Sequence, residues 1–272
     1  MKSFRVFADG IDVERNKIEN VSQNNTPHCH DRYEILYIID GKGKCIIEGV
    51  EYPISPRCIF VLPPFSYHTL RLEEYSTLDY ASVMFIEEGA LSVVKDMLSD
   101  FGLTEENVSP AVFYSANAIS DQIAAVVERF EISDSFPEQI RSTFMQLLIS
   151  ELILLVSTAA RVRSVRGDSE IGVRVIRYLN DNITADISLD MLAKRFFVSK
   201  YHLCRAFKKH NGISVHGYVN QKRVLYAKQL IEAGETASRA AYQVGFGDYS
   251  AFYRAYVKVM GKAPTSSNSD TI

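Results

Sequence analysis

The sequence lacks the features that mark several protein classes. Its four cysteines, Cys29, Cys45, Cys58 and Cys204, include no C-x-x-C pair, which argues against a zinc site or a disulfide framework. No run reaches the roughly 20 apolar residues of a membrane span, and the amino terminus has no apolar signal core. We therefore expect a soluble, cytoplasmic protein without a membrane partner.

A strong overall charge is also absent, because the net charge of the 272 residues is only −3. This value hides a division. From Asp168 onward there are 15 Lys and Arg against 9 Asp and Glu, a balance of +6, whereas the preceding part has 15 against 24, a balance of −9. A basic half suits contact with phosphates, and an acidic half would be repelled by them. The length itself predicts one large or two ordinary domains.

Residues 187–264 contain the same pattern of helix, tight turn and helix twice, about fifty residues apart. Ser188 and Ser199 are N-caps in the first copy, and Gly212 ends its second helix. In the second copy Gly245 makes the turn and Asp248 caps the helix that follows. In both copies the second helix has an apolar inner face and a basic, aromatic and hydroxyl-rich outer face. This pattern is typical of the helix-turn-helix reader of the DNA major groove.

The inner faces follow from helical spacing. They comprise Leu189, Leu192, Ala193, Phe196, Leu203, Ala206 and Phe207 in the first copy, and Ala237, Ala240, Ala241, Val244, Ala251, Phe252, Ala255 and Tyr256 in the second. For either copy alone, a helical domain with a solvated basic face fits about as well. The repetition favours DNA.

Residues 214–233 join the two copies with an amphipathic pattern that contains no proline, which predicts one continuous helix. At 1.5 Å per residue, this helix spans about 30 Å. Successive major-groove segments on one face of B-DNA lie roughly 34 Å apart. One chain can therefore place two recognition helices in adjacent grooves.

Several motifs in this region form a specific combination. They are ISLDMLA at 187–193, S-x-x-x-L-x-R-x-F-K-K at 199–209, G-x-S at 212–214, R-x-x-x-A at 223–227, A-x-x-V-G-F at 241–246, and F-x-R-x-Y followed by G-x-x-P at 252–264. Over about a hundred residues they resemble the AraC/XylS family of bacterial transcription regulators. The resemblance implies a DNA-binding regulator rather than an enzyme, and an activator that acts beside RNA polymerase, often for sugar or other catabolic genes.

The exposed positions of the two recognition helices predict how DNA would be contacted. Arg205 and Arg254 are the strongest candidates for base contacts, since arginine can donate two hydrogen bonds to guanine, and their alternative is a phosphate or a carboxylate. The second helix carries fewer basic residues, so we expect the first to supply most of the specificity. The predicted base contacts are Tyr201, His202, Cys204, Arg205, Tyr249, Ser250, Tyr253 and Arg254, and the predicted phosphate contacts are Lys200, Lys208, Lys209, Arg223 and Lys258.

The amino-terminal half is predicted to begin with a polar arm, residues 1–26, followed by a strand-rich region over about 27–115. Apolar runs rich in β-branched and aromatic residues occupy 33–39, 44–47, 51–54, 58–62, 68–72 and 80–86, with Gly and Pro turns between them. Such spacing predicts a barrel or a sandwich. The fold class is therefore α+β, a β-barrel with two helices followed by an all-α domain.

One group of side chains in the strand-rich region has chemical potential. His28 and His30 would point to the same side of a strand. The motifs H-x-H-x-x-x-E-x-x-x-x-x-x-G at 28–41 and P-P-x-x-x-H ending at His68 resemble the cupin barrel. In metal-binding cupins the matching histidines and glutamate, here Glu34, hold a divalent metal. The sequence departs from the family at 55–58, where a Pro-Gly-Asp turn is usual, and this puts metal binding in doubt.

In AraC-like sensor domains, the resemblance implies, the same pattern lines an effector pocket. We therefore predict no cofactor and a small-molecule effector, such as a sugar, bound by His28, His30, Glu34, Tyr37 and His68. Tyr37 fits an ordinary strand aromatic equally well. A metalloenzyme built on the histidines is the competing hypothesis, but it does not account for the duplicated helix-turn-helix. A third hypothesis is a constitutive DNA-binding protein whose barrel only dimerises.

Helical periodicity returns at 118–160. The second helix there, opened by Pro137, is apolar almost all round over 144–156 and needs cover on both sides. Burial within the chain is one solution, and the resemblance favours the other, a homodimer formed through paired helices. The charged stretch 161–172 predicts a linker between a sensor and dimerisation domain, 1–160, and a DNA-binding domain, 173–272. Coupling between them is expected through the arm or the linker.

Overall fold

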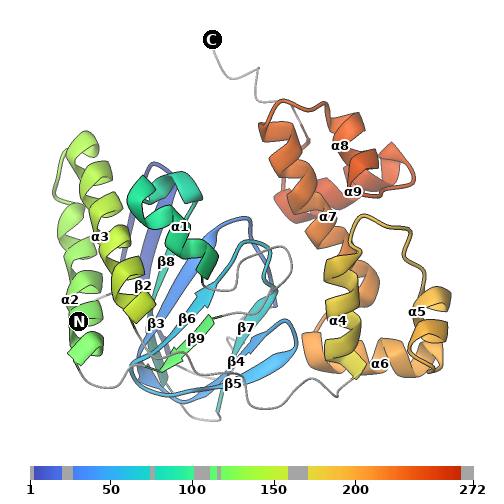
Figure 1. Ribbon diagram of the computed structural model, residues 1–272, viewed down its shortest axis with the longest axis horizontal. Helices are drawn as coiled ribbons and strands as arrows, with labels where there is room; N and C mark the ends of the chain where they lie inside the picture. The colour runs from blue at the N-terminus through green and yellow to red at the C-terminus, as the bar shows by residue number, and fades with distance from the viewer. Residues whose placement is uncertain are drawn as a thin grey trace. The chain divides into compact units, whose positions relative to one another are not determined.

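The computed structural model divides into two compact units (Figure 1). It describes residues 3–19, 27–73, 77–100, 111–114, 118–158 and 171–264. The first unit comprises Met1–Thr26, Arg32–Ile47 and Glu51–Val165, and the second comprises Pro27–Asp31, Glu48–Val50 and Arg166–Ile272. The second unit therefore takes in two short segments of the amino-terminal half. Most of the predicted linker, 161–170, lies outside the described residues.

The first unit is built on two antiparallel sheets. The larger has the order β1-β2-β8-β3-β6-β9 and the smaller the order β5-β4-β7. The six strands predicted from the apolar runs are confirmed, with ends that differ by up to three residues. The strands are β1 Phe4–Ala8, β2 Ile11–Glu19, β3 Tyr33–Gly41, β4 Gly43–Ile47, β5 Val50–Ile54, β6 Cys58–Leu62, β7 His68–Leu72, β8 Thr77–Phe85 and β9 Ala111–Tyr114.

The prediction of a polar arm over 1–26 is wrong for residues 4–19, which form the hairpin β1–β2. Asp9 and Gly10 make its two-residue turn with positive φ values of 42° and 76°, and Asp-Gly is a favoured sequence for such turns. Charged residues disguised the strands, because Arg5 pairs with Asp12 across the hairpin at 3.0 Å. The hypothesis of coupling through an arm therefore does not apply to residues 4–19.

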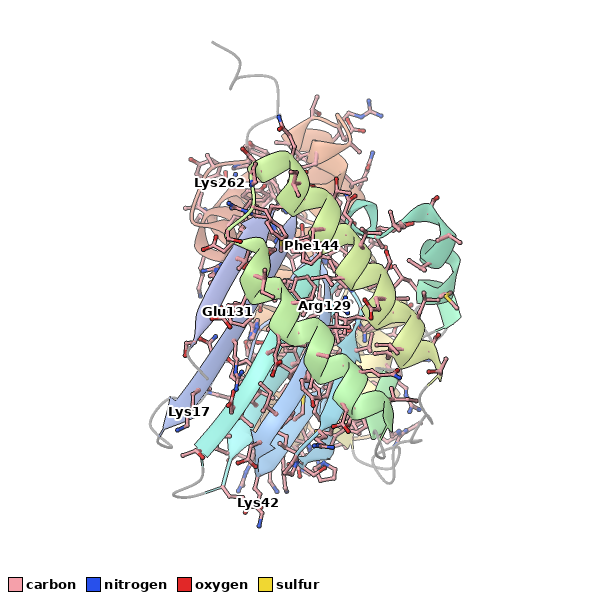
Figure 2. The ribbon with its side chains drawn as sticks, turned by 90° about the vertical axis from the view of Figure 1, so that its left-hand side faces the viewer. Lys17, Lys42, Arg129, Glu131, Phe144 and Lys262 are labelled. Atoms are coloured by element: carbon pink, nitrogen blue, oxygen red, sulfur yellow. The ribbon has the colours of Figure 1, made fainter. Side chains whose placement is uncertain are left out.

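The helices of the first unit cover one face of the larger sheet (Figure 2). They are η1 Glu87–Gly89, α1 Ser92–Asp100, α2 Ala118–Ser133 and α3 Glu138–Thr158. Ile35 and Val83 from the sheet share a core with Phe130 of α2 and Leu152 of α3. Each fully buried side chain of this size stabilises the fold by about 1.5–3 kcal/mol. Neither α1 nor β9 was predicted from the sequence.

Helix α3 is long and apolar enough, by length and composition alone, to cross a membrane. This qualifies the sequence-based expectation that no such segment exists. A core helix of a globular domain meets the same criterion, and Met145, Ile149 and Val156 of α3 are fully buried in the core described above. Burial within the chain therefore covers one side of α3.

The second unit contains the two predicted helix-turn-helix modules. Ser188, Ser199 and Asp248 are N-caps, as predicted, and accept hydrogen bonds from backbone N–H groups three residues on, at 3.1, 3.1 and 2.7 Å. Gly212 ends the first recognition helix in the left-handed region, also as predicted. The helices are α4 Ile171–Asp181, α5 Leu189–Arg195, α6 Lys200–Asn211, α7 Val215–Glu232, α8 Ala237–Gln243 and α9 Tyr249–Met260.

Candidate functional site

The outer face of α6 gathers the side chains predicted to contact DNA. Leu203 and Phe207 anchor the helix in the core, which turns the opposite face to solvent. Tyr201 is 74% exposed, and Cys204 is half-buried. The exposed residues of this face are Lys200, Tyr201, His202, Arg205, Lys208 and Lys209.

Lys200 has a partner within the protein, because its ammonium lies 2.7 Å from Asp190 of α5. Both side chains are more than half exposed, and an exposed ion pair of this kind contributes little stability. The lysine can therefore exchange the carboxylate for a phosphate at small cost. Its predicted phosphate contact stays a prediction.

Helix α9 presents the second predicted face. Phe252 and Tyr256 pack inward with Val244 and Phe246 of the preceding turn. The rings of Tyr249 and Tyr253 lie one turn apart on the outside, with centroids 6.4 Å from each other. The predicted contact residues Tyr249, Ser250, Tyr253, Arg254 and Lys258 are all exposed.

Arg223 contradicts its predicted role as a phosphate contact, because it is only 9% exposed and points into the unit. Its guanidinium donates to the backbone oxygens of Ile183 at 2.8 Å, Ala185 at 2.6 Å and Gly245 at 2.6 Å. Burial lowers the pKa of Arg223, and Asp186 opposes that shift. The side chain thus joins the α4–α5 loop to the turn of the second module. Sequence spacing gave no sign of this, because the three acceptors lie 22 to 40 residues away.

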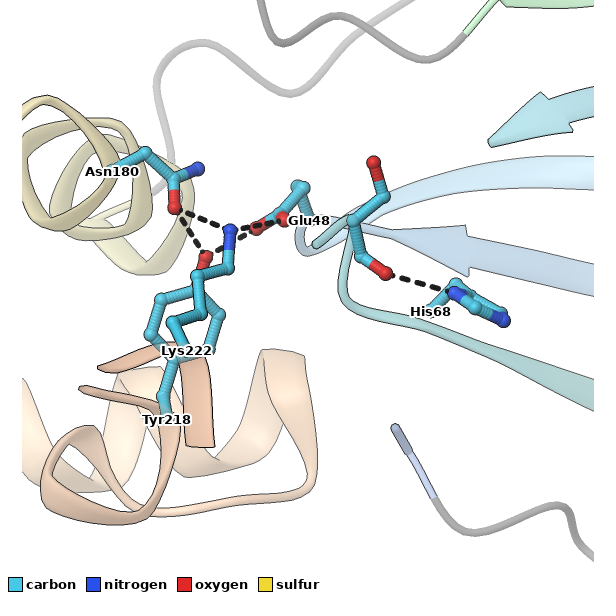
Figure 3. Close-up of polar contacts among 6 residues, drawn as sticks. Glu48, His68, Asn180, Tyr218 and Lys222 are labelled. Atoms are coloured by element: carbon cyan, nitrogen blue, oxygen red, sulfur yellow. Dashed lines mark hydrogen bonds and ion pairs between the residues drawn. The ribbon is translucent and has the colours of Figure 1, made fainter. Parts of the chain in front are cut away.

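A buried polar cluster lies beside the first module in the second unit (Figure 3). The Lys222 ammonium of α7 donates to Glu48 Oε1 at 2.8 Å and to Asn180 Oδ1 of α4 at 2.6 Å. The Tyr218 hydroxyl lies 2.5 Å from Glu48 Oε2 and 2.7 Å from the same Asn180 oxygen. Burial raises the pKa of Tyr218 well above its usual value, and the Glu48 charge adds to that shift. Helical periodicity did not reveal this cluster.

The segment Pro27–Asp31 makes a second set of contacts in the same unit. Asp31 pairs with Lys228, two turns beyond Lys222 on α7. The pKa of Lys228 is raised, because burial, which lowers it, is outweighed by the hydrogen bonds and negative charges of Asp31 and Glu232 together. Cys29 of the same segment is buried, and burial raises the pKa of its thiol to about 12. Helix α7 therefore holds both short segments through lysine–carboxylate pairs.

The residues predicted to line the effector pocket divide between the two units. Glu34 and His68 belong to the first, where His68 Nε2 lies 3.2 Å from Glu34 Oε2 and Nδ1 lies 2.9 Å from the Ser66 carbonyl oxygen. Ser82 donates to the other oxygen of Glu34 at 2.5 Å. His28 and His30 belong to the second unit, with ring centroids 6.1 Å apart.

Tyr37 does not share the face of Glu34. The two residues are three positions apart on β3, and alternate residues of a strand point to opposite faces. Tyr37 packs in the core under α2 and α3, and burial raises the pKa of its hydroxyl. This position in the core suits the alternative prediction of an ordinary strand aromatic better than a place beside Glu34 in a pocket.

Each half of the chain matches a known protein family. Residues 18–148 match the AraC-like ligand binding domain, and residues 192–268 match a helix-turn-helix domain. The HTH-type transcriptional regulator YbfI of Bacillus subtilis is 27% identical over 244 residues, which cover 88% of this chain and 86% of that protein. The HTH-type transcriptional activator RhaS of an Enterobacter species is 21% identical over 238 residues, covering 87% and 85%.

Among solved structures, ToxT from Vibrio cholerae O395 aligns over 94% of this chain and 95% of its own, with 16% identity and a TM-score of 0.38. Both relatives are named as transcription regulators. The chain therefore belongs to the AraC family of helix-turn-helix transcription regulators and carries an N-terminal AraC-like ligand-binding domain.

Proposed function

We propose that this regulator is an effector-responsive activator of catabolic genes, with sugar-utilisation genes as the first to examine. The observation that carries the proposal is the pair of exposed recognition faces on α6 and α9 in a chain that also has a ligand-binding domain. The relative RhaS is named a transcriptional activator, which supports activation rather than repression. RNA polymerase is then the partner beside the bound protein.

Base and phosphate contacts divide between the exposed residues. Arg205 and Arg254 are exposed on the outer faces, where a guanidinium can donate two hydrogen bonds to one guanine. The ammonium groups of Lys200, Lys208, Lys209 and Lys258 supply phosphate contacts, which raise affinity without selecting a sequence. Specificity then depends on the arginines and their aromatic and polar neighbours.

The experiment that tests the proposal is recovery of bound fragments from genomic DNA with purified wild-type protein and with Arg205→Ala. Wild-type protein should select a motif of two half-sites, and the genes beside it narrow the effector class. Arg205→Ala should weaken binding to that motif about 5- to 150-fold, because a bidentate arginine–guanine contact is worth about 1–3 kcal/mol. The preference for guanine at one position should be lost.

Lys209→Ala is the matched control on the same face of α6. It should weaken binding to all DNA sequences alike. The slope of the logarithm of the binding constant against log[salt] should decrease in magnitude by about one. Diffuse, salt-sensitive binding that is the same with and without Arg205 would refute the sequence-specific regulator.

The effector is proposed to bind the first unit near the buried pair of Glu34 and His68. A ligand can regulate the protein only if it binds one arrangement better than another. Sugars that raise the thermal unfolding temperature of the protein should also change its affinity for the selected DNA site. The alternative role of His28, His30, Glu34 and His68 is to bind a metal ion instead of an effector. Metal analysis of the purified protein tests it, since a stoichiometric divalent ion would favour the metal site.

Dimerisation is proposed to occur through the outer side of α3. Ile140, Leu147 and Leu154 are 57%, 51% and 46% exposed and follow one another at intervals of seven residues. This spacing aligns them on one face of the helix, as in a coiled-coil seam. A second copy of α3 would cover that seam, whereas the opposite side of the helix is already buried.

Leu147→Glu should therefore convert a dimer to a monomer while leaving the fold intact. The introduced carboxylate would lie in the centre of the seam and lose its water on association. Sedimentation equilibrium measures the oligomeric state, and Val93→Glu, which places the same carboxylate at a 77% exposed apolar position of α1, is the control. A wild-type protein that is monomeric at high concentration would contradict the proposal.

A further inference from the structure

The two helix-turn-helix modules share one turn geometry, which makes their residues directly comparable. After α5, the N–H of Phe197 donates to Lys194 O at 3.3 Å, and that of Val198 donates to Ala193 O at 3.0 Å. After α8, Gly245 and Phe246 make the same two bonds, to Tyr242 and Ala241. This is the Schellman arrangement, which places the first residue after the helix cap in the left-handed region.

The two modules fill that left-handed position differently. Gly245 has a φ of 94°, and a Cβ there would lie 2.5 Å from the backbone oxygen of Thr184, so space and conformation both require glycine. Phe197 has a φ of 55°. Bulky residues are genuine outliers in this region, and strain of this kind is often retained at functional positions.

Packing within the protein does not account for Phe197. Its side chain is 93% exposed, the highest value among the large apolar residues of the described chain. An aromatic ring that stays in water contributes no burial energy to folding. The ring thus brings strain to the turn without a compensating contact in the described part of the molecule.

The surroundings of Phe197 favour DNA as the partner. Phe197 lies two residues before Ser199, the N-cap of α6, and the first turn of a recognition helix is the part that meets base edges. Lys194, Arg195 and Lys200 around it are exposed and positively charged. An apolar ring at such a place can contact the C5-methyl group of thymine, which the major groove displays.

We propose that Phe197 is a specificity-determining residue of the first module, whose ring contacts a thymine methyl group in the major groove. The inference rests on DNA binding by that module as described above and adds a residue outside its recognition helix. Phe197 reads an apolar feature, whereas Arg205 reads hydrogen-bond acceptors. The two contacts therefore specify different base pairs of the first half-site.

The test uses full-length protein and the DNA site selected by wild type, with each thymine replaced in turn by uracil, which lacks the methyl group. At one position, uracil should weaken wild-type binding about three- to tenfold, the value expected for one buried methyl group with its neighbours. Phe197→Gly should weaken binding to thymine DNA by a similar factor and be insensitive to uracil there. Its dependence on salt should not change, because no charge is lost.

Two controls separate this result from general damage. Phe197→Gly should raise the thermal unfolding temperature, since glycine relieves the left-handed strain. Phe7→Ala removes another exposed aromatic, 56% exposed on β1 of the first unit, and should leave DNA binding unchanged.

Three outcomes would overturn the inference. The first is a Phe197→Gly variant with wild-type affinity and the wild-type response to uracil. The second is unchanged DNA binding with lost activation in purified transcription, which would assign the ring to RNA polymerase. The third is a wild-type protein that selects no site, which would refute sequence-specific binding itself and is recognised before any variant is compared.

Discussion

Replacing Arg223 with methionine should lower the free energy of unfolding of the second unit by about 3–5 kcal/mol, because three buried backbone oxygens lose a charged hydrogen-bond donor. The loss comes from the backbone oxygens of Ile183, Ala185 and Gly245, which lose their charged donors while remaining covered. An unsatisfied buried acceptor costs about 1–3 kcal/mol. For a domain of this size, the unfolding temperature should fall by about 12–25 °C. Calorimetry or chemical denaturation of the purified variant measures both quantities.

Two further variants distinguish this structural role from a phosphate contact. Arg223→Lys should restore only part of the stability, because an ammonium cannot match the planar fork of a guanidinium. Arg239→Met is the matched control, since Arg239 is 73% exposed and its ion pair is with Glu235, which directly precedes the N-cap of α8. At a temperature where Arg223→Met is folded, its DNA binding should keep the wild-type dependence on salt. Wild-type stability combined with a reduced salt dependence would restore the phosphate role.

Lys222→Met should destabilise the second unit by about 3–5 kcal/mol, because it leaves the Glu48 carboxylate buried without its cation. The Lys222 and Glu48 side chains are only 3% and 7% exposed, so water cannot replace either partner while the segment stays in place. Glu48→Leu alone should cost a similar amount, since the buried ammonium then loses its counter-charge and keeps its hydrogen bond to Asn180. Urea denaturation monitored by circular dichroism gives the unfolding free energies of wild type and of both single variants, and the double variant completes the cycle.

The double variant Glu48→Leu with Lys222→Met is the decisive member of that cycle. It should recover most of the loss, because replacing a whole buried ion pair with apolar side chains is often nearly neutral. A coupling energy above about 2 kcal/mol is expected for two groups in direct contact. Single losses that simply add would show that Glu48 and Lys222 are not paired in the folded protein.

Local chemistry explains why the helix-turn-helix modules could be predicted in detail. Ser199 and Asp248 are N-caps that accept hydrogen bonds from backbone N–H groups three residues on. Gly212 and Gly245 adopt the left-handed conformation that ends the preceding helix. The outer faces of α6 and α9 follow from helical periodicity alone. These features depend on neighbours along the chain, so one sequence contains the information.

The same reasoning accounts for the errors. Arg15 of β2 reads as a surface residue, yet it is buried and donates to Asp79 of β8, 64 residues away, at 3.0 and 2.8 Å. Charges of this kind hid the strand pattern of residues 4–19. The sequence leaves the role of Tyr37 open, because periodicity along a strand does not show which face of the sheet the helices cover.

The sequence by itself thus determined the family, the two recognition helices, their caps and most strands of the first unit. The tertiary structure alone decided which cations are free to meet DNA. Arg223 and Lys222 are adjacent on α7 and have the same formal charge as Lys208 and Lys209, yet both are buried. A buried cation must be paired, and its partners here, Gly245 and Glu48 among them, lie 22 to 174 residues away. Only folding brings such partners together, so no pattern along the chain records them.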